Sequence, residues 1–191
     1  MNKAVKIILW LAGILVALVL LFALVIGPML KKSTKKHSPE VTEVYTSDDL
    51  EIEIFYSSPS KKDRVIFGEL VPYNEVWRTG ANEATTFTTN KELIIDGKTL
   101  AAGSYTLWTV PGEKDWQIIF NSQMYSWGVR WQDSKAMREP EHDALVATAV
   151  VSESITIEEN FTIKVVETPA QAMVLMFSWD QVVVPLPMEA K

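Results

Sequence analysis

The chain has 191 residues, with 18 basic and 24 acidic residues, no cysteine and a formal net charge of −6. This length suits one domain with an appendage, and the lack of cysteine excludes disulfides, thiol catalysis and cysteine zinc sites. Beyond residue 30 the balance is 16 basic to 24 acidic residues, a net charge of −8. Such acidity, without a basic stripe, argues against nucleic acid as a partner and favours neutral or cationic ligands.

The first predicted element is an apolar helix from Ile7 to Ile26, twenty residues without a charge. At 1.5 Å per residue it would be about 30 Å long, roughly the hydrocarbon thickness of a bilayer. A cleaved signal peptide has a shorter apolar stretch followed by small residues, and a core helix shows a polar face. We therefore predict a single-pass transmembrane helix with a short basic flank over residues 1–30, with the helix ending at Gly27 and Pro28.

A polar segment with four lysines, residues 31–39, follows this helix and is predicted to be a short tether. One β domain is predicted over residues 40–191. Only two lysines and the α-amino group precede the apolar helix, so the distribution of basic residues mildly favours a cytoplasmic domain.

The domain is predicted to be mainly β, because short runs of β-branched and aromatic residues alternate with turn residues. The pair Asp96 and Gly97 between two such runs predicts a two-residue hairpin. About ten short, closely spaced strands favour an antiparallel sandwich or barrel. The predicted strands are residues 50–56, 85–89, 93–95, 99–100, 105–110, 116–120, 145–151, 155–157, 161–166, 173–177 and 182–186.

The common catalytic signatures are absent: the sequence has no nucleophile elbow, no phosphate-binding glycine loop and no dinucleotide fingerprint. Outside the tether, the one histidine is His142, between Glu141 and Asp143. A lone histidine in such a setting is more often a loop residue than a catalytic group or a ligand. We therefore predict no metal site and no cofactor.

A glycine-containing loop before the strand at residues 85–89 is rich in groups that can bind a ligand. In one interpretation its arginine grips a carboxylate or phosphate, while a glutamate serves as general acid or base and an asparagine orients the ligand. In the other, the arginine and the glutamate form a partly buried ion pair, the asparagine bonds to the backbone, and the tryptophan is core. The residues concerned are Tyr73, Trp77, Arg78, Asn82 and Glu83.

Six tryptophans lie beyond the apolar helix. Trp108, Trp116 and Trp179 stand in or beside predicted strands and are expected to fill the core. Trp127 and Trp131 occupy a short polar segment and are equally well explained as core residues or as an aromatic platform for an apolar or sugar-like ligand.

Seven short motifs resemble the bacterial family called "domain of unknown function 2911". The longest is the run from Trp77 to Thr85, and the resemblance extends over roughly residues 38–187. Two positions depart from the family pattern, which usually has arginine at Ser58 and glycine at Asp63. The motifs are residues 56–60, 66–73, 77–85, 102–105, 109–112, 116–121 and 127–128.

The family has no assigned reaction, so the resemblance implies no mechanism. It does imply an extracytoplasmic setting, because similar proteins carry export signals, and we give this more weight than the distribution of basic residues. We therefore expect an extracytoplasmic ligand-binding or interaction module of the cell envelope, held to the lipid bilayer through Ile7–Ile26, whose partner is a neutral or cationic ligand or an envelope protein. The alternatives are a structural envelope protein and a metal-independent hydrolase using Glu83 with Arg78.

Overall fold

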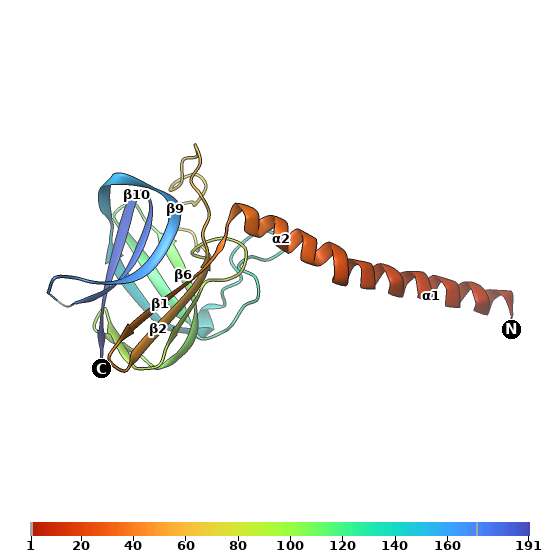
Figure 1. Ribbon diagram of the computed structural model, residues 1–191, viewed down its shortest axis with the longest axis horizontal. Helices are drawn as coiled ribbons and strands as arrows, with labels where there is room; N and C mark the ends of the chain where they lie inside the picture. The colour runs from red at the N-terminus through yellow and green to blue at the C-terminus, as the bar shows by residue number, and fades with distance from the viewer. Residues whose placement is uncertain (1, 171) are drawn as a thin grey trace. The chain divides into compact units, whose positions relative to one another are not determined.

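The computed structural model describes residues 2–170 and 172–191, with all their side chains except those at positions 30 and 31. Two compact units follow one another along the chain, Met1–His37 and Ser38–Lys191. The first is helical, and the second holds ten strands among the described residues (Figure 1).

The N-terminal unit consists of α1 (Lys3–Leu21), a π-helical turn η1 (Phe22–Ile26) and α2 (Gly27–His37). Together these elements form a helical segment of 35 residues, Lys3–His37, that is long and apolar enough to cross a membrane. Its position near the N-terminus fits a membrane anchor and a signal sequence alike.

The helix does not end at Gly27 and Pro28, as predicted, but continues to His37. Proline has no backbone N–H and crowds the carbonyl four residues before it, which normally breaks or kinks a helix. Here the preceding turn is π-helical, and the Gly27 N–H donates to the carbonyl of Phe22. This wider turn accommodates the proline, and the segment predicted to be a short tether is largely helical.

The second unit contains a six-stranded and a four-stranded antiparallel sheet, which confirms the predicted mainly β fold. The order β1-β2-β3-β6-β7-β8 makes the larger sheet and β5-β4-β10-β9 the smaller. The strands are β1 (Glu40–Ser47), β2 (Leu50–Ser57), β3 (Thr86–Thr89), β4 (Leu93–Ile95), β5 (Lys98–Leu100), β6 (Gly103–Pro111), β7 (Asp115–Asn121), β8 (Asp143–Val150), β9 (Ser152–Glu167) and β10 (Met173–Ala190), with a short 3-10 turn η2 (Pro140–His142) before β8.

Alternation of side chains along the strands builds the core between the two sheets. In β2, Leu50, Ile52 and Ile54 are buried while Glu51 and Glu53 face solvent. Figure 1 shows β1 and β2 in one layer and β9 and β10 in the layer facing it. The apolar faces of both layers therefore meet in one continuous core.

A cluster of aromatic rings fills one part of this core. Trp116 and Trp179 are almost fully buried and contact Phe67, with ring centroids 5.2 and 6.2 Å away. Phe161 of β9 joins them 5.7 Å from Trp179. Trp108 is also buried, so the prediction that Trp108, Trp116 and Trp179 are core residues is confirmed.

The β4–β5 hairpin links the two sheets along one seam. Its turn residues Asp96 and Gly97 have φ angles of 50° and 68°, which the predicted two-residue turn requires. Asp96 Oδ2 accepts a hydrogen bond of 3.2 Å from the backbone N of Thr148, and Lys98 Nζ donates to the Val146 carbonyl at 2.7 Å. Side chains of the smaller sheet thus cover the free edge of β8.

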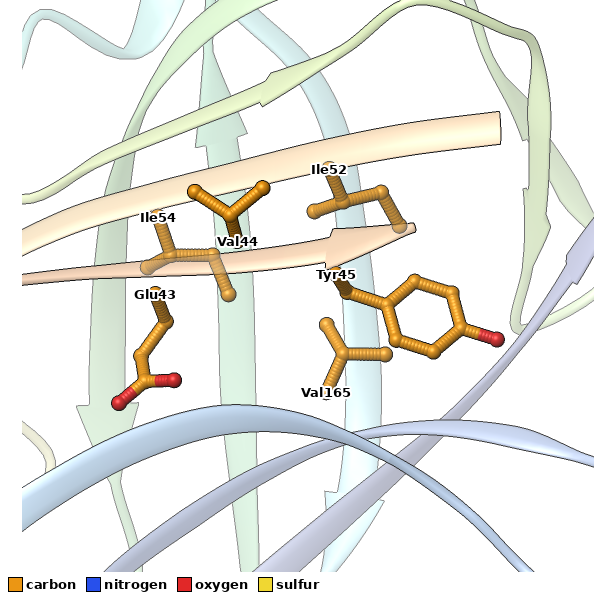
Figure 2. A pocket seen from close by; sticks show the side chains of 6 residues that line it. All are labelled: Glu43, Val44, Tyr45, Ile52, Ile54 and Val165. Carbon is orange, nitrogen blue, oxygen red and sulfur yellow. The ribbon is translucent and has the colours of Figure 1, made fainter. Parts of the chain in front are cut away.

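At the opposite seam, β1 and β2 face β9 across a small cavity of about 40 Å³ (Figure 2). Tyr45 of β1 donates its hydroxyl hydrogen bond to Glu167 of β9 across this seam, and the bond raises the pKa of Tyr45. The cavity is far smaller than the roughly 300–1,000 Å³ of small-molecule pockets, so it has no room for a drug-sized organic ligand. Its lining residues are Glu43, Val44, Tyr45, Ile52, Ile54 and Val165.

Two strand predictions differ from the structure. β1 was not predicted, because its inward positions include the polar residues Glu43 and Ser47 and the hydrophobic alternation is broken. The four predicted strands between residues 155 and 186 are instead the two long strands β9 and β10. These strands stay paired across irregularities in register near Asp180, which has a φ of 55°.

Candidate functional site

The loop from Tyr73 to Thr85 is held in an unusual backbone conformation. Thr79, Gly80 and Asn82 have φ angles of 55°, 146° and 57°. Thr79 is fully buried, and its carbonyl accepts a hydrogen bond of 2.7 Å from Thr85 Oγ1. A β-branched residue in the left-handed region is rare and strained, and such strain persists only where surrounding contacts enforce it.

Gly80 is required in this loop because the chain passes very close to β2. A β-carbon at this position would lie 2.9 Å from the backbone oxygen of Ser57. Its φ of 146° is also one that L side chains rarely adopt. The loop therefore lies directly against the end of β2.

Trp77, at the start of this loop, packs in the aromatic core. Its backbone exchanges two hydrogen bonds with Thr109 of β6, at 2.7 and 3.1 Å. Its ring stacks on Trp179 with a centroid distance of 6.0 Å and lies 4.9 Å from Phe161. Trp77 therefore lies among core side chains, as the structural interpretation of the loop expected.

Tyr73 lies in another part of the loop, and its ring packs on Gly68. A β-carbon at residue 68 would lie 3.0 Å from the ring. The neighbouring Asn74 N–H donates to the carbonyl of Pro111, at the end of β6.

Arg78 is buried for most of its length against a glycine from a distant loop. A β-carbon at Gly128 would lie 2.5 Å from Cδ of Arg78 and 2.8 Å from its Cβ. The Arg78 Nε donates one long hydrogen bond of 3.4 Å to the carbonyl of Gly80. The two segments pack closely because position 128 has no side chain.

The ion pair between Arg78 and Glu83, one of the two interpretations of the sequence, does not form within the described part of the chain. Burial lowers the pKa of Arg78, and no carboxylate offsets this effect. Glu83 is half-buried, and its Oε2 is enclosed by protein. Burying a cation without a carboxylate partner is costly, so Arg78 is poorly explained as a purely stabilising residue.

Asn82 ties three segments together through its backbone and its side chain. Its Nδ2 donates to the carbonyl of Ser38, the first residue of the β unit, at 3.5 Å. Its own carbonyl accepts a hydrogen bond of 3.1 Å from the Gly128 N–H. The Asn82 side chain thus bonds to the backbone, as the structural interpretation of the loop expected.

Residues 128–137 form a compact turn that carries Trp131 at the surface. Val129 and Ala136 form an isolated bridge, and Arg130 binds Asp133 through two hydrogen bonds of 3.2 and 2.7 Å. The ion pair lowers the pKa of Asp133. Trp131 is 85% exposed, so the turn holds an aromatic ring in solvent.

Trp127 stacks on Trp131, with a centroid distance of 6.0 Å and an interplanar angle of 8°. Trp127 is half-buried and immediately precedes Gly128, the residue that covers Arg78. The two rings therefore form an exposed aromatic pair beside the buried arginine. We call Arg78, Trp127, Gly128 and Trp131 the tryptophan–arginine surface.

A second, smaller core fixes this surface to the outer side of the larger sheet. Trp108 and Ile119 point away from the main core and are covered by the loop that follows β7. Tyr125 packs edge-on against Trp108 with a centroid distance of 5.5 Å, and Met137 joins the same cluster. All seven predicted site residues come from the two loops that meet here, and Arg78 and Asn82 make the contacts with Gly128 that join these loops.

Gly128 and Ser38 were not predicted as parts of the site. The Trp-Gly pair at residues 127 and 128 was among the family motifs, which was the only signal for Gly128. Ser38 and Asn82 are 44 positions apart, and no pattern in a single sequence predicts their contact.

Glu139, Glu141 and His142, at and just before η2, offer ligand atoms within 4.8 Å of one another. The side chains of Glu139 and His142 are 56% and 43% exposed. Exposed acidic groups commonly gather on surfaces without an ion, so this arrangement by itself supports no metal assignment.

The fold and these loops define a two-sheet β domain, preceded by an apolar helix, that displays an aromatic pair beside a buried arginine. The chain matches the family described as "protein of unknown function (DUF2911)" over residues 38–188, and it belongs to that family. Comparison with curated proteins and with solved structures gave no match.

Proposed function

We propose that this protein is a membrane-anchored, extracytoplasmic binding module whose recognition site is the tryptophan–arginine surface. The helical segment Lys3–His37 would act as the anchor. The strands serve as the rigid support for two loops, and the loops present the binding groups. No reaction is part of this proposal.

The observation that carries the proposal is the state of Arg78. Its side chain is half-buried, makes one long hydrogen bond to Gly80 and has no carboxylate partner in the described chain. The remaining N–H groups of this guanidinium are held in a fixed, planar geometry. They can donate hydrogen bonds to an oxygen acceptor on a ligand. The exposed face of Trp131 beside it suits a flat apolar group.

The net charge of −8 beyond residue 30 opposes strongly anionic partners over the domain as a whole. The expected partner is therefore neutral overall, or positively charged elsewhere. It offers a polar oxygen to Arg78 and an apolar face to the tryptophans.

The alternatives explain these features less well. A purely structural envelope protein has no need of an 85% exposed tryptophan stacked on a second one. A hydrolase using Glu83 with Arg78 would need the two groups to act together, but Arg78 has no carboxylate partner in the described chain.

The stability of an Arg78→Met variant tests the proposal. Methionine keeps the apolar contact with Gly128 and removes a buried charge without a partner. The melting temperature should therefore stay level or rise by a few degrees. A structural arginine would instead give a marked loss of stability.

A thermal-shift screen of neutral glycans and glycerophospholipid headgroups would complete this test. A ligand of the surface raises the melting temperature of the wild-type chain and leaves that of Arg78→Met and Trp131→Ala unchanged. Equal shifts in all three proteins would place the ligand elsewhere and refute the assignment of the surface.

The extracytoplasmic location has its own test. Added protease should degrade the β domain in intact spheroplasts, and a cytoplasmic marker protein should survive. Full protection of the domain until the cells are lysed would refute this part of the proposal.

A further inference from the structure

The tryptophan–arginine surface lies beside the point where the chain enters the β domain. Asn82 joins the carbonyl of Ser38 to the N–H of Gly128 through two hydrogen bonds. Trp131 is three residues beyond Gly128, a span of at most about 11 Å of chain. The exposed tryptophan pair therefore belongs to the end of the domain where the tether attaches.

The tether limits how far this end can stand from the lipid. Ser38 follows α2, whose 11 residues span about 16 Å. The headgroup layer itself extends about 5–7 Å beyond the hydrocarbon. Any tilt of the helix brings Ser38, and the surface beside it, closer to the headgroups.

The exposed groups at this end suit a lipid–water interface. Trp131 is 85% exposed, and tryptophan is enriched at the headgroup level of bilayers. Among the described residues of these two loops, three cations, Arg78, Arg130 and Lys135, stand with the carboxylates of Asp133 and Glu83, although the domain is acidic as a whole. Lipid phosphates supply the oxygen acceptors that such cations bind.

We propose that the partner of the tryptophan–arginine surface is the phospholipid headgroup layer of the membrane that holds the chain. This inference rests on the anchor and the surface proposed above. Trp127 and Trp131 lie at the interface, and the cations around them bind phosphate groups. The β domain is thereby docked on the bilayer by one loop face, in addition to its helical anchor.

Site-specific labels on the full chain test this docking, because the protein contains no cysteine and each introduced thiol is unique. Gln132→Cys places a fluorescent label next to Trp131. Glu92→Cys is the matched control, since residue 92 follows Lys91, which pairs with Asp49 in the turn at the far end of β1. Each labelled chain is reconstituted into vesicles of zwitterionic and anionic phospholipids that carry a quencher near the headgroups.

The label at residue 132 should lose fluorescence through the lipid-borne quencher, and the label at residue 92 should not. Changing Trp127 and Trp131 together to Ala should abolish the loss at residue 132. Equal quenching at residues 132 and 92 would overturn the docking and leave the surface open to a soluble ligand. Failure of the chain to float with the vesicles would instead refute the anchor, and with it this inference.

Discussion

Trp77 and Trp131 stand in similarly polar stretches of the chain, yet their surroundings differ completely. Trp77 stacks on Trp179 inside the aromatic cluster, whereas Trp131 is 85% exposed and contacts Trp127. The difference arises from backbone pairing, because the bridge from Trp77 to Thr109 turns its ring towards the core.

Alanine substitutions should separate these two tryptophans. Trp77→Ala leaves a cavity among four aromatic rings and should lower the free energy of unfolding by about 3 kcal/mol. Trp131→Ala removes an exposed ring and should change it by less than about 0.5 kcal/mol. Urea unfolding followed by circular dichroism measures both values. Comparable losses in the two variants would show that Trp131 is also a packing residue.

Gly128→Ala should disturb the site through a direct clash. The new methyl group would lie 2.5 Å from Cδ of Arg78, and overpacking of this kind costs about 1–3 kcal/mol. Combining the change with Arg78→Ala removes the clash with Cγ and Cδ, so the double variant should regain part of the stability. Strictly additive losses in thermal unfolding would contradict this contact.

The candidate site was only partly predictable at this scale. The loop composition identified Arg78 and Asn82, and the separate tryptophan pair was noticed from its polar setting. The nearness of Glu83 to Arg78 in sequence suggested an ion pair. The left-handed residues Thr79 and Asn82 lie between them and set the course of the loop, and sequence spacing does not reveal such backbone angles.

At the scale of elements, strand prediction succeeded where apolar residues alternate cleanly and failed where they do not. β2 and the β4–β5 hairpin have clear patterns and turn residues. β1 has Glu43 on its inward side and was missed. β9 and β10 continue through register irregularities that resemble strand ends in the sequence. The helix beyond Pro28 was missed because a π turn is not encoded by any simple pattern.

The seam between β5 and β8 makes a prediction at this scale. The double change Asp96→Ala and Lys98→Ala removes two hydrogen bonds to the β8 backbone, each contributing about 0.5–1.5 kcal/mol. Amide exchange at Thr148 should become faster, because its N–H loses its acceptor. Exchange at Ile118 in β7 serves as the control and should be unchanged. An unaltered rate at Thr148 would show that the seam is held by other contacts.

At the scale of the whole molecule, the chain joins an apolar helix to a compact β unit that begins at Ser38. The helix fits an anchor or a signal sequence, and these alternatives differ in what remains of the mature chain. Retention of all 191 residues is expected of an anchor.

Mass spectrometry of the protein extracted from membranes should therefore find the intact chain of 21.5 kDa. The protein should also resist extraction by alkaline carbonate, because a helix with about 20 apolar residues is held by the hydrocarbon core. A peripheral membrane protein is the control for the wash. A shorter mass lacking the N-terminal residues, in the soluble fraction, would identify a signal sequence.

Asn82 would also have a mechanical consequence if the N-terminal helix anchors the protein, as proposed above. Beyond His37, force on the tether enters the domain at Ser38 and Pro39, whose carbonyls bond to Asn82 and Ser58 at 3.5 and 2.8 Å. The longer bond is the weaker, so a pull would first break the bond between Asn82 and Ser38. The contact of Asn82 with Gly128 would then loosen. Tension in the tether would then reach the tryptophan pair before it strained any strand, which makes this surface the first part of the domain to respond to load.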